Sequence, residues 1–165
     1  MIAISNSGPL IHLAQLGCLE WLTELFEKVI IPIEVYNETV IEGKKNNHVD
    51  AILIENMIQA NFIEVCKNDI SIKQFYQSEF LHKGEISAIN LALSLDEEII
   101  LLDDEEARIS ARQLKLKVKG TLGILFDVYT KKIISKELAI ISLKRINQIM
   151  YLSSDVFNYV LEKFD

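Results

Sequence analysis

The sequence contains few residues that interrupt helices and strands or cross-link the chain. Its 165 residues include two cysteines, two prolines and six glycines. Cys18 and Cys66 have no CxxC spacing, which favours two reduced thiols over a disulfide framework or a cysteine zinc site. Half of the residues are apolar, so the composition is typical of an ordered globular chain and excludes most disordered classes.

Long apolar runs and common catalytic motifs are also missing. No run is long enough to span a membrane, and the N-terminus MIAISNSGPL lacks the basic segment and apolar core of a signal peptide. We therefore expect a cytoplasmic protein with no membrane partner. Walker A, GxGxxG and GxSxG motifs are absent, so NTPases, dinucleotide-binding enzymes and serine hydrolases lack their signatures. His12 lies in an apolar helical pattern and is expected at or near the core.

Charge is distributed unevenly along a chain whose net charge is −7. Residues 1–111 carry a net charge of −12, residues 112–145 carry +7, and the last twenty residues carry −2. A basic segment that follows an acidic body can bind a polyanion. A lysine-rich solvated surface explains the same pattern equally well, and both interpretations stay open.

Short apolar runs alternate with longer amphipathic patterns, and 42–50 reads as a loop or helix junction. Strands are predicted at 2–5, 28–32, 60–66, 98–102 and 116–120, and helices at 7–17, 19–26, 33–42, 83–95, 105–115, 121–132, 135–150 and 154–163. This alternation predicts an α/β fold with a parallel sheet covered on both faces. We expect one domain over residues 1–165, on which the helices from about residue 135 pack.

Polar side chains follow two of the predicted strands. Asn6 follows the first strand, and Asp103 and Asp104 follow the strand ILL. In parallel α/β folds, sites form outside the carboxyl ends of the strands. Glu38 and Glu85, from two helices, could join them there. Mg²⁺ prefers oxygen ligands and relieves the repulsion between neighbouring carboxylates, so the pattern suits a metal site for phosphoryl chemistry.

Helix capping is the simpler explanation of the same acids. Asp103 or Asp104 could cap the helix that follows, and Glu105 and Glu106 would then complement its dipole. Glu85 would likewise favour a helix N-terminus, and Glu38 could be a solvated helix residue.

Five segments, taken in order, resemble the PIN-domain family. They are ISNSGPLIHLAQLG, IPIEVYNET, KGEISAINLAL, ILLDDEEARISARQL and KGTLGIL, and they run from residue 2 to about residue 126. The resemblance is closest to a prokaryotic PIN-like branch often predicted to bind nucleic acid. It implies a three-layer, Rossmann-like fold and an acidic cluster that binds Mg²⁺ or Mn²⁺. It also implies cleavage of single-stranded or structured RNA, with toxin–antitoxin partners and homodimers common among relatives.

By position, the resemblance places the four acids of the family at Asn6, Glu38, Glu85 and the Asp103–Asp104 pair. All five of these residues are candidate metal ligands. The candidate catalytic residues are the acidic ones among them, namely Glu38, Glu85, Asp103 and Asp104. The family pattern favours Asp104 over Asp103, whereas helix spacing from Glu85 is compatible with either.

Further side chains have supporting roles in this interpretation. Ser7 and Thr121 stand where PIN proteins often place hydroxyls near the metal, and Arg108 would orient an acid or contact a phosphate. Lysines of the basic segment are the candidate RNA-binding residues, namely Lys115, Lys117, Lys119, Lys131 and Lys132.

Two functions therefore compete. The first is a Mg²⁺- or Mn²⁺-dependent ribonuclease, toxin-like and paired with an antitoxin. The second is a weak or inactive PIN-like module that binds nucleic acid or protein. Asn6 separates them, because an amide supplies one neutral oxygen where the family has a negative charge.

Overall fold

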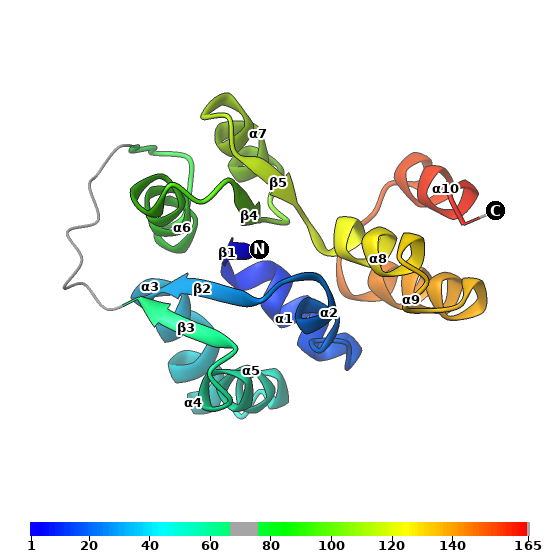
Figure 1. Cartoon of the computed structure of the whole chain (residues 1–165), viewed down its shortest axis with the longest axis horizontal. Helices are drawn as coiled ribbons and strands as arrows, with labels where there is room; N and C mark the ends of the chain where they lie inside the picture. Colours follow the sequence, from blue (N-terminus) through cyan, green and yellow to red (C-terminus); the bar gives the residue numbers. More distant parts are fainter. Residues whose placement is uncertain (67–75, 165) are drawn as a thin grey trace.

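A parallel β-sheet forms the centre of the computed structural model, which describes residues 1–66 and 76–164 (Figure 1). Its strands are β1 (Ile2–Ser5), β2 (Lys28–Pro32), β3 (Ile63–Cys66), β4 (Ile99–Leu101) and β5 (Lys117–Lys119). They lie in the order β3-β2-β1-β4-β5, and every neighbouring pair is parallel. The predicted strands are confirmed, including β3 as an edge strand.

The middle strand shows why the sheet is buried on both faces. Along β1, Ala3 packs into one apolar cluster and Ile4 into another, because successive side chains point to opposite faces. Ile4 lies in register with Ile30 on β2 and Ile100 on β4. Continuous apolar strands of this kind are typical of parallel sheets with helices on both sides.

The helices of the described residues follow the predicted alternation closely. They are α1 (Ser7–Leu16), α2 (Trp21–Leu25), α3 (Ile33–Tyr36), α4 (Gly43–Lys45), α5 (Val49–Gln59), α6 (Lys83–Leu95), α7 (Glu105–Gln113), α8 (Thr121–Thr130), α9 (Lys136–Ile149) and α10 (Ser154–Glu162). A π-helical turn, η1 (Asn37–Glu42), joins α3 to α4.

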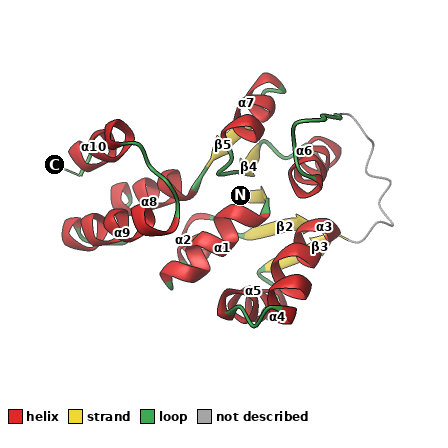
Figure 2. Cartoon of the chain, turned by 180° about the vertical axis from the view of Figure 1, so that it is seen from behind, coloured by secondary structure: helices red, strands yellow, loops and turns green. Residues whose placement is uncertain are grey.

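Two apolar clusters divide these helices between the faces of the sheet. One cluster joins the sheet to α1, α2, α5, α8 and α9, and the other joins it to α6 and α7. Figures 1 and 2 show α6 and α7 on one side of the strands and α1 on the other. The predicted three-layer α/β architecture is confirmed.

Some boundaries differ from the sequence prediction. The helix predicted over 7–17 is α1, which Asn6 precedes and Gly17 ends at φ 70°. α2 is shorter than the 19–26 pattern. α5 was not predicted. Its inner face holds Ala51 and Ile54, but exposed apolar side chains on the same helix obscure the periodicity.

The two last helices extend the molecule to one side (Figure 1). α9 packs against α8 and α1, and α10 packs against α9. α10 has no fully buried residue, so it covers the molecule without entering the core. Among the described residues, no helix is long and apolar enough to cross a membrane.

Candidate active site

A polar pocket of about 580 Å³ opens at the carboxyl edge of the sheet. The strand order reverses between β1 and β4, which is the point where open α/β sheets form their binding crevice. Its lining brings together all five candidate ligands and several further polar residues, namely Asn6, Ser7, Gly8, His12, Glu38, His82, Lys83, Glu85, Asp103 and Asp104. Residues almost a hundred positions apart in the sequence thus share one site.

Asn6 joins β1 to α1 and has a buried, unpartnered oxygen. Its backbone N–H donates to Leu101 O on β4 at 3.1 Å, which fixes it between the two strands. The side chain is 7% exposed, and Oδ1 has no hydrogen-bond partner among the described residues. An unpaired buried acceptor costs about 1–3 kcal/mol. A cation or a donor bound in the pocket would offset that cost.

Glu85 carries the clearest electrostatic signal in the pocket. It lies in the first turn of α6, is 6% exposed, and accepts a hydrogen bond from His82 N at 2.9 Å. Burial raises the pKa of its carboxyl, and the negative charges of Asp104 and Glu38 raise it further, against the His82 hydrogen bond. The carboxylates therefore repel one another, as expected of groups that would share a cation.

Glu38 reaches the pocket from the π-helical turn η1. Ser7 Oγ at the start of α1 donates a hydrogen bond to its Oε2. A Cβ on Gly84 would lie 2.8 Å from both carboxylate oxygens of Glu38. A side chain at Gly84 would therefore displace the Glu38 carboxylate from its position beside Ser7, and glycine lets α6 approach that carboxylate closely.

Asp103 is held by three hydrogen bonds. Thr121 donates from its backbone N and from Oγ1, each at 2.7 Å, and His12 Nδ1 lies 2.7 Å from Oδ2. The Asp103 side chain is 8% exposed. This carboxylate thus ties the end of β4 to the second turn of α1 and to the first turn of α8.

Asp104 has two roles at once. Its Oδ1 accepts a hydrogen bond from Ala107 N at 3.0 Å and so caps α7, while the residue also lines the pocket. Glu105 and Glu106 occupy the first turn of α7, where their charges favour the helix dipole. Capping and a place in the pocket are therefore compatible explanations of the same acid.

A family model described as a PIN domain matches residues 2–165 of the chain. This chain belongs to the PIN-domain family. The resemblance of the five sequence segments is thereby confirmed. No curated protein and no solved structure matches the chain.

In this PIN domain, the supporting residue Ser7 lines the pocket, and Thr121 and Arg108 lie at its border. Thr121 contacts that carboxylate directly, as described above. Arg108 Nη1 donates to Leu102 O at 3.1 Å. A Cβ on Gly120 would collide with the Arg108 guanidinium and lie 2.8 Å from Asp103 Oδ1, so Arg108 and Asp103 both crowd this glycine.

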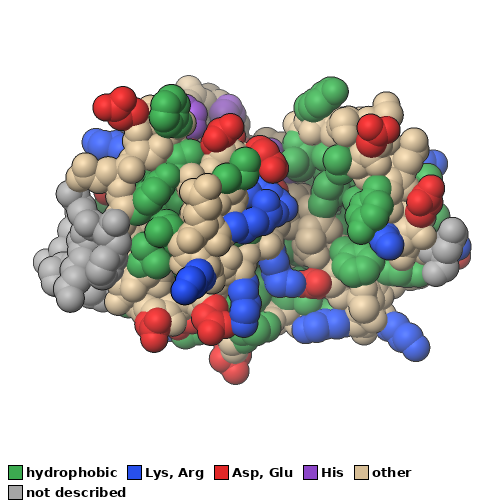
Figure 3. Space-filling model, turned by 90° about the horizontal axis from the view of Figure 1, so that it is seen from above, with side chains coloured by type: hydrophobic (Ala, Val, Ile, Leu, Met, Phe, Trp, Pro, Cys, Tyr) green, Lys and Arg blue, Asp and Glu red, His purple; other side chains and the backbone are tan. Residues whose placement is uncertain are grey.

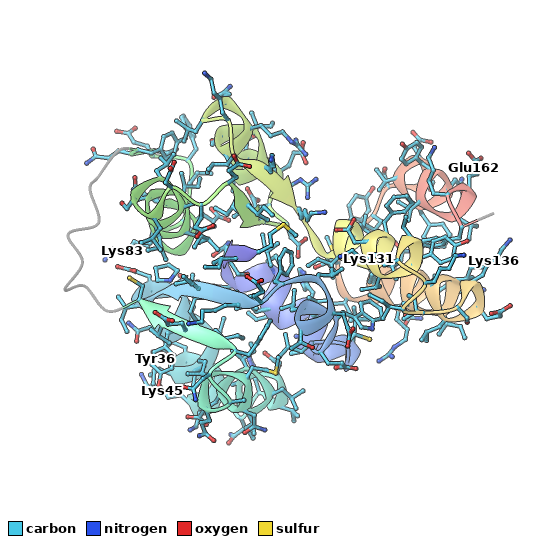
Figure 4. All side chains as sticks on the ribbon, in the orientation of Figure 1. Tyr36, Lys45, Lys83, Lys131, Lys136 and Glu162 are labelled. Atoms are coloured by element: carbon cyan, nitrogen blue, oxygen red, sulfur yellow. The ribbon has the colours of Figure 1, made fainter. Side chains whose placement is uncertain are left out.

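The five candidate lysines do not form one patch. Lys117 pairs with Glu98, and Lys119 pairs with Asp127. Lys115 is exposed after α7, and Lys131 and Lys132 follow α8 at the end remote from Thr121. Figure 4 shows Lys131 on the opposite side of the view from Lys83, which lines the pocket. RNA binding by this set stays a prediction.

Sequence reasoning missed four residues of the pocket, namely Gly8, His12, His82 and Lys83. His12, expected at or near the core, is half-buried in the pocket beside Asp103, and His82 and Lys83 flank Glu85. A usable signal existed for His12. It stands four residues after Gly8 on α1, so both lie on one helix face, and α1 starts at the carboxyl edge of the sheet.

The donor set fits a hard divalent cation. It consists of carboxylates and one amide oxygen, which Mg²⁺ and Mn²⁺ prefer. Within residues 1–66 and 76–164, no three His, Cys, Asp or Glu side chains already converge as a metal-binding group. The ligands are gathered around a pocket instead of closing on one point, and the unpaired Asn6 Oδ1 is the strongest local sign of fit.

Proposed function

We propose that this PIN domain is a nuclease that hydrolyses RNA phosphodiesters with Mg²⁺ or Mn²⁺. One observation carries the proposal. The buried, unpartnered Asn6 Oδ1 shares a pocket with four carboxylates, and two of these raise the pKa of a third. Such a cluster is unfavourable without a counter-charge, and membership of the PIN-domain family supports a nuclease role.

Asn6, Glu38, Glu85 and Asp104 would hold the ion, and Asp103 would add its charge while it keeps its bonds to Thr121 and His12. A bound divalent cation lowers the pKa of a coordinated water and stabilises charge on the phosphodiester. Ser7 Oγ orients Glu38, and the His82 N–H orients Glu85. Both carboxylates are thus positioned before substrate arrives.

The decisive experiment replaces Glu85 with Gln. We expect the purified protein to cleave RNA with Mn²⁺ or Mg²⁺ and to lose this activity with EDTA. Glu85→Gln should reduce the rate at least about a hundredfold, because oxyanion and metal contacts of this kind carry such factors. The ionised form of Glu85 is disfavoured by burial, so the Gln variant should melt at no lower temperature.

Glu106→Gln is the matched control, since Glu106 is exposed in the first turn of α7 and does not line the pocket. It should cleave at the native rate. Equal rates for the native protein and Glu85→Gln, with contaminating nuclease excluded, would rule out the proposed site.

A second function rests on Asn6. Because this position is neutral, the pocket has one negative charge fewer than the family pattern, and metal binding weakens accordingly. The alternative is a PIN-like module that binds nucleic acid or protein without cleavage. The two functions differ in one measurable property, metal affinity, which is taken up in the Discussion.

The biological setting is also a proposal. We propose that residues 1–165 act as one PIN-like unit in the cytoplasm, as the toxin-like partner of an antitoxin protein, and that two copies can associate as a homodimer. Family membership supports this setting, and Cys18 and Cys66 are not joined in a disulfide, as expected in a reducing compartment. A toxin-like nuclease expressed alone should arrest growth, and co-expression of the product of an adjacent small gene should relieve that arrest. An unchanged arrest would contradict the pairing.

A further inference from the structure

A second hollow adjoins the acidic pocket. It has a volume of about 540 Å³ and lies between α7 and β5 on one side and α8 and the α9–α10 connection on the other. Asp103 lines both this hollow and the acidic pocket. Figure 3 shows the surface hollowed between two parts of the molecule, with Lys and Arg side chains beside the hollow. We call it the Tyr151 groove.

Tyr151 stands out in the lining of this groove. It lies in the short connection between α9 and α10 and is 89% exposed. Among the described residues, no ring or cation packs on its face, whereas Tyr129 and Tyr159 each have such a partner. An aromatic ring held in solvent at the mouth of a groove leaves a large apolar face available for stacking.

The groove floor has room for a flat ligand. Gly123 lies within α8, where glycine costs up to about 1 kcal/mol relative to alanine. A Cβ there would meet only Lys119 Cβ within 4 Å, at 3.8 Å, so neighbouring atoms do not explain the glycine. Gly123 and Tyr151 line the same groove, and the open helix face at Gly123 suits close approach by a planar group.

Arg108 lines the groove, and its guanidinium and the Asp103 carboxylate both lie against Gly120. The Arg108 guanidinium is fixed by its bond to Leu102 O and keeps further N–H groups. The rest of the groove lining carries Lys119 against Asp103, Glu105 and Asp127. Asp127 pairs with Lys119, and Glu105 lies 3.8 Å from Arg108 Nε. Such a groove does not track a long polyanion, but it matches one aromatic base and one phosphate.

We propose that the Tyr151 groove binds the nucleotide next to the scissile phosphate of a single-stranded nucleic acid, with its base stacked on Tyr151 and its phosphate at Arg108. This inference rests on the proposed function, because the acidic pocket defines the scissile position. It narrows the substrate to unpaired nucleotides, since the faces of a paired base are already covered by its neighbours in a duplex.

A thermodynamic cycle between Tyr151 and the base tests the proposal. The full chain with Glu85→Gln is titrated with short fluorescent single-stranded RNAs, each intact or abasic at one position. Tyr151→Ala should weaken binding about 5- to 100-fold, as aromatic–base stacking does, and Tyr151→Phe should keep it. At one position of the RNA, removing the base should weaken binding to the protein that keeps Tyr151. The same removal should leave binding to the Tyr151→Ala protein unchanged.

Tyr159→Ala is the matched control, because Tyr159 is an exposed tyrosine on α10 that does not line the groove. Equal affinities of the Tyr151→Ala and Tyr159→Ala proteins would overturn the inference, as would abasic effects that are the same with and without Tyr151. If the native protein cleaves RNA but shows no coupling between Tyr151 and a base, the proposed groove is refuted and the nuclease function stands. An intact cycle without cleavage refutes the nuclease and supports the groove.

Discussion

At the scale of single residues, Asn6 has the largest effect on the acidic pocket. Its amide oxygen is buried without a partner beside carboxylates that already repel one another. The atom that weakens the site electrostatically is therefore also the atom that most requires a ligand. A carboxylate at this position would add charge to the pocket and raise both the cost of the empty site and its affinity for a cation.

Asn6→Asp should therefore change two measurements in opposite directions. The melting temperature without metal should fall, because a fifth carboxylate joins the pocket. Affinity for Mn²⁺, measured by calorimetry, should rise by roughly tenfold or more, because affinity follows the number of charged ligands. Asn158→Asp, an exposed site on α10, should change neither measurement.

The same variant separates the two candidate functions. If the native protein neither binds Mn²⁺ nor cleaves RNA, and Asn6→Asp does both, the regulatory module is the correct description. If the native protein already binds and cleaves, the nuclease is correct.

At the scale of elements, Asp103 acts as a joint between strands and helices. It links the end of β4 to the first turn of α8 through Thr121, and to α1 through His12. Gly8 lies against this joint, and a Cβ there would make an ordinary van der Waals contact with Asp103 Cβ at 3.5 Å. Asp103 thus adds a polar link to the apolar packing that holds α8, which forms one wall of the Tyr151 groove.

Thr121→Val should cost about 1–3 kcal/mol of the free energy of unfolding, measured with urea. The change keeps the shape of a fully buried side chain but removes the Oγ1 bond to a charged, mostly buried partner. Thr130→Val, in the last turn of the same helix, removes an exposed bond to Phe126 O and should cost a few tenths. Equal losses at both positions would show that Asp103 is not the joint.

Most elements could be predicted from the sequence, because periodicity reports burial. The helix at 83–95 has the predicted limits, and 2–5 and 28–32 are strands as predicted. α5 was missed because Val49, Ile52 and Leu53 are apolar yet exposed. The acidic residues of the site could be predicted from the sequence, but their hydrogen-bond partners could not. The His12–Asp103 bond joins residues 91 apart, and no local pattern encodes it.

At the scale of the whole molecule, the candidate lysines are spread over a long surface. Lys117 and Lys119 lie on β5 and Lys115 lies just before it. Lys131 and Lys132 lie beyond α8, a helix about 15 Å long whose first residue, Thr121, is bonded to Asp103. An RNA that reaches both the acidic pocket and the second group must extend along the whole of α8. Only the longer substrates can then use Lys131 and Lys132.

Replacing Lys131 and Lys132 with Gln should therefore weaken binding of RNAs of about ten nucleotides and leave trinucleotides unaffected. The slope of log affinity against log salt should become shallower by roughly 1.4 for the longer RNA, about 0.7 for each lost phosphate contact. Lys44→Gln with Lys45→Gln is the matched control, because these lysines lie on α4 and pair with Glu55 and Glu42. Unchanged slopes in both double variants would remove the second group from the RNA path.

The close approach of Gly84 to Glu38 has a consequence for reading related sequences. A side chain at 84 would displace the Glu38 carboxylate from Ser7, so the two positions are coupled: a chain that keeps glutamate at 38 in this position is expected to keep glycine at 84. A chain that has lost the glutamate is released from that restriction and can drift to alanine or serine. Comparing the residues at positions 38 and 84 across related sequences can therefore distinguish chains that keep a functional pocket from chains that have lost it.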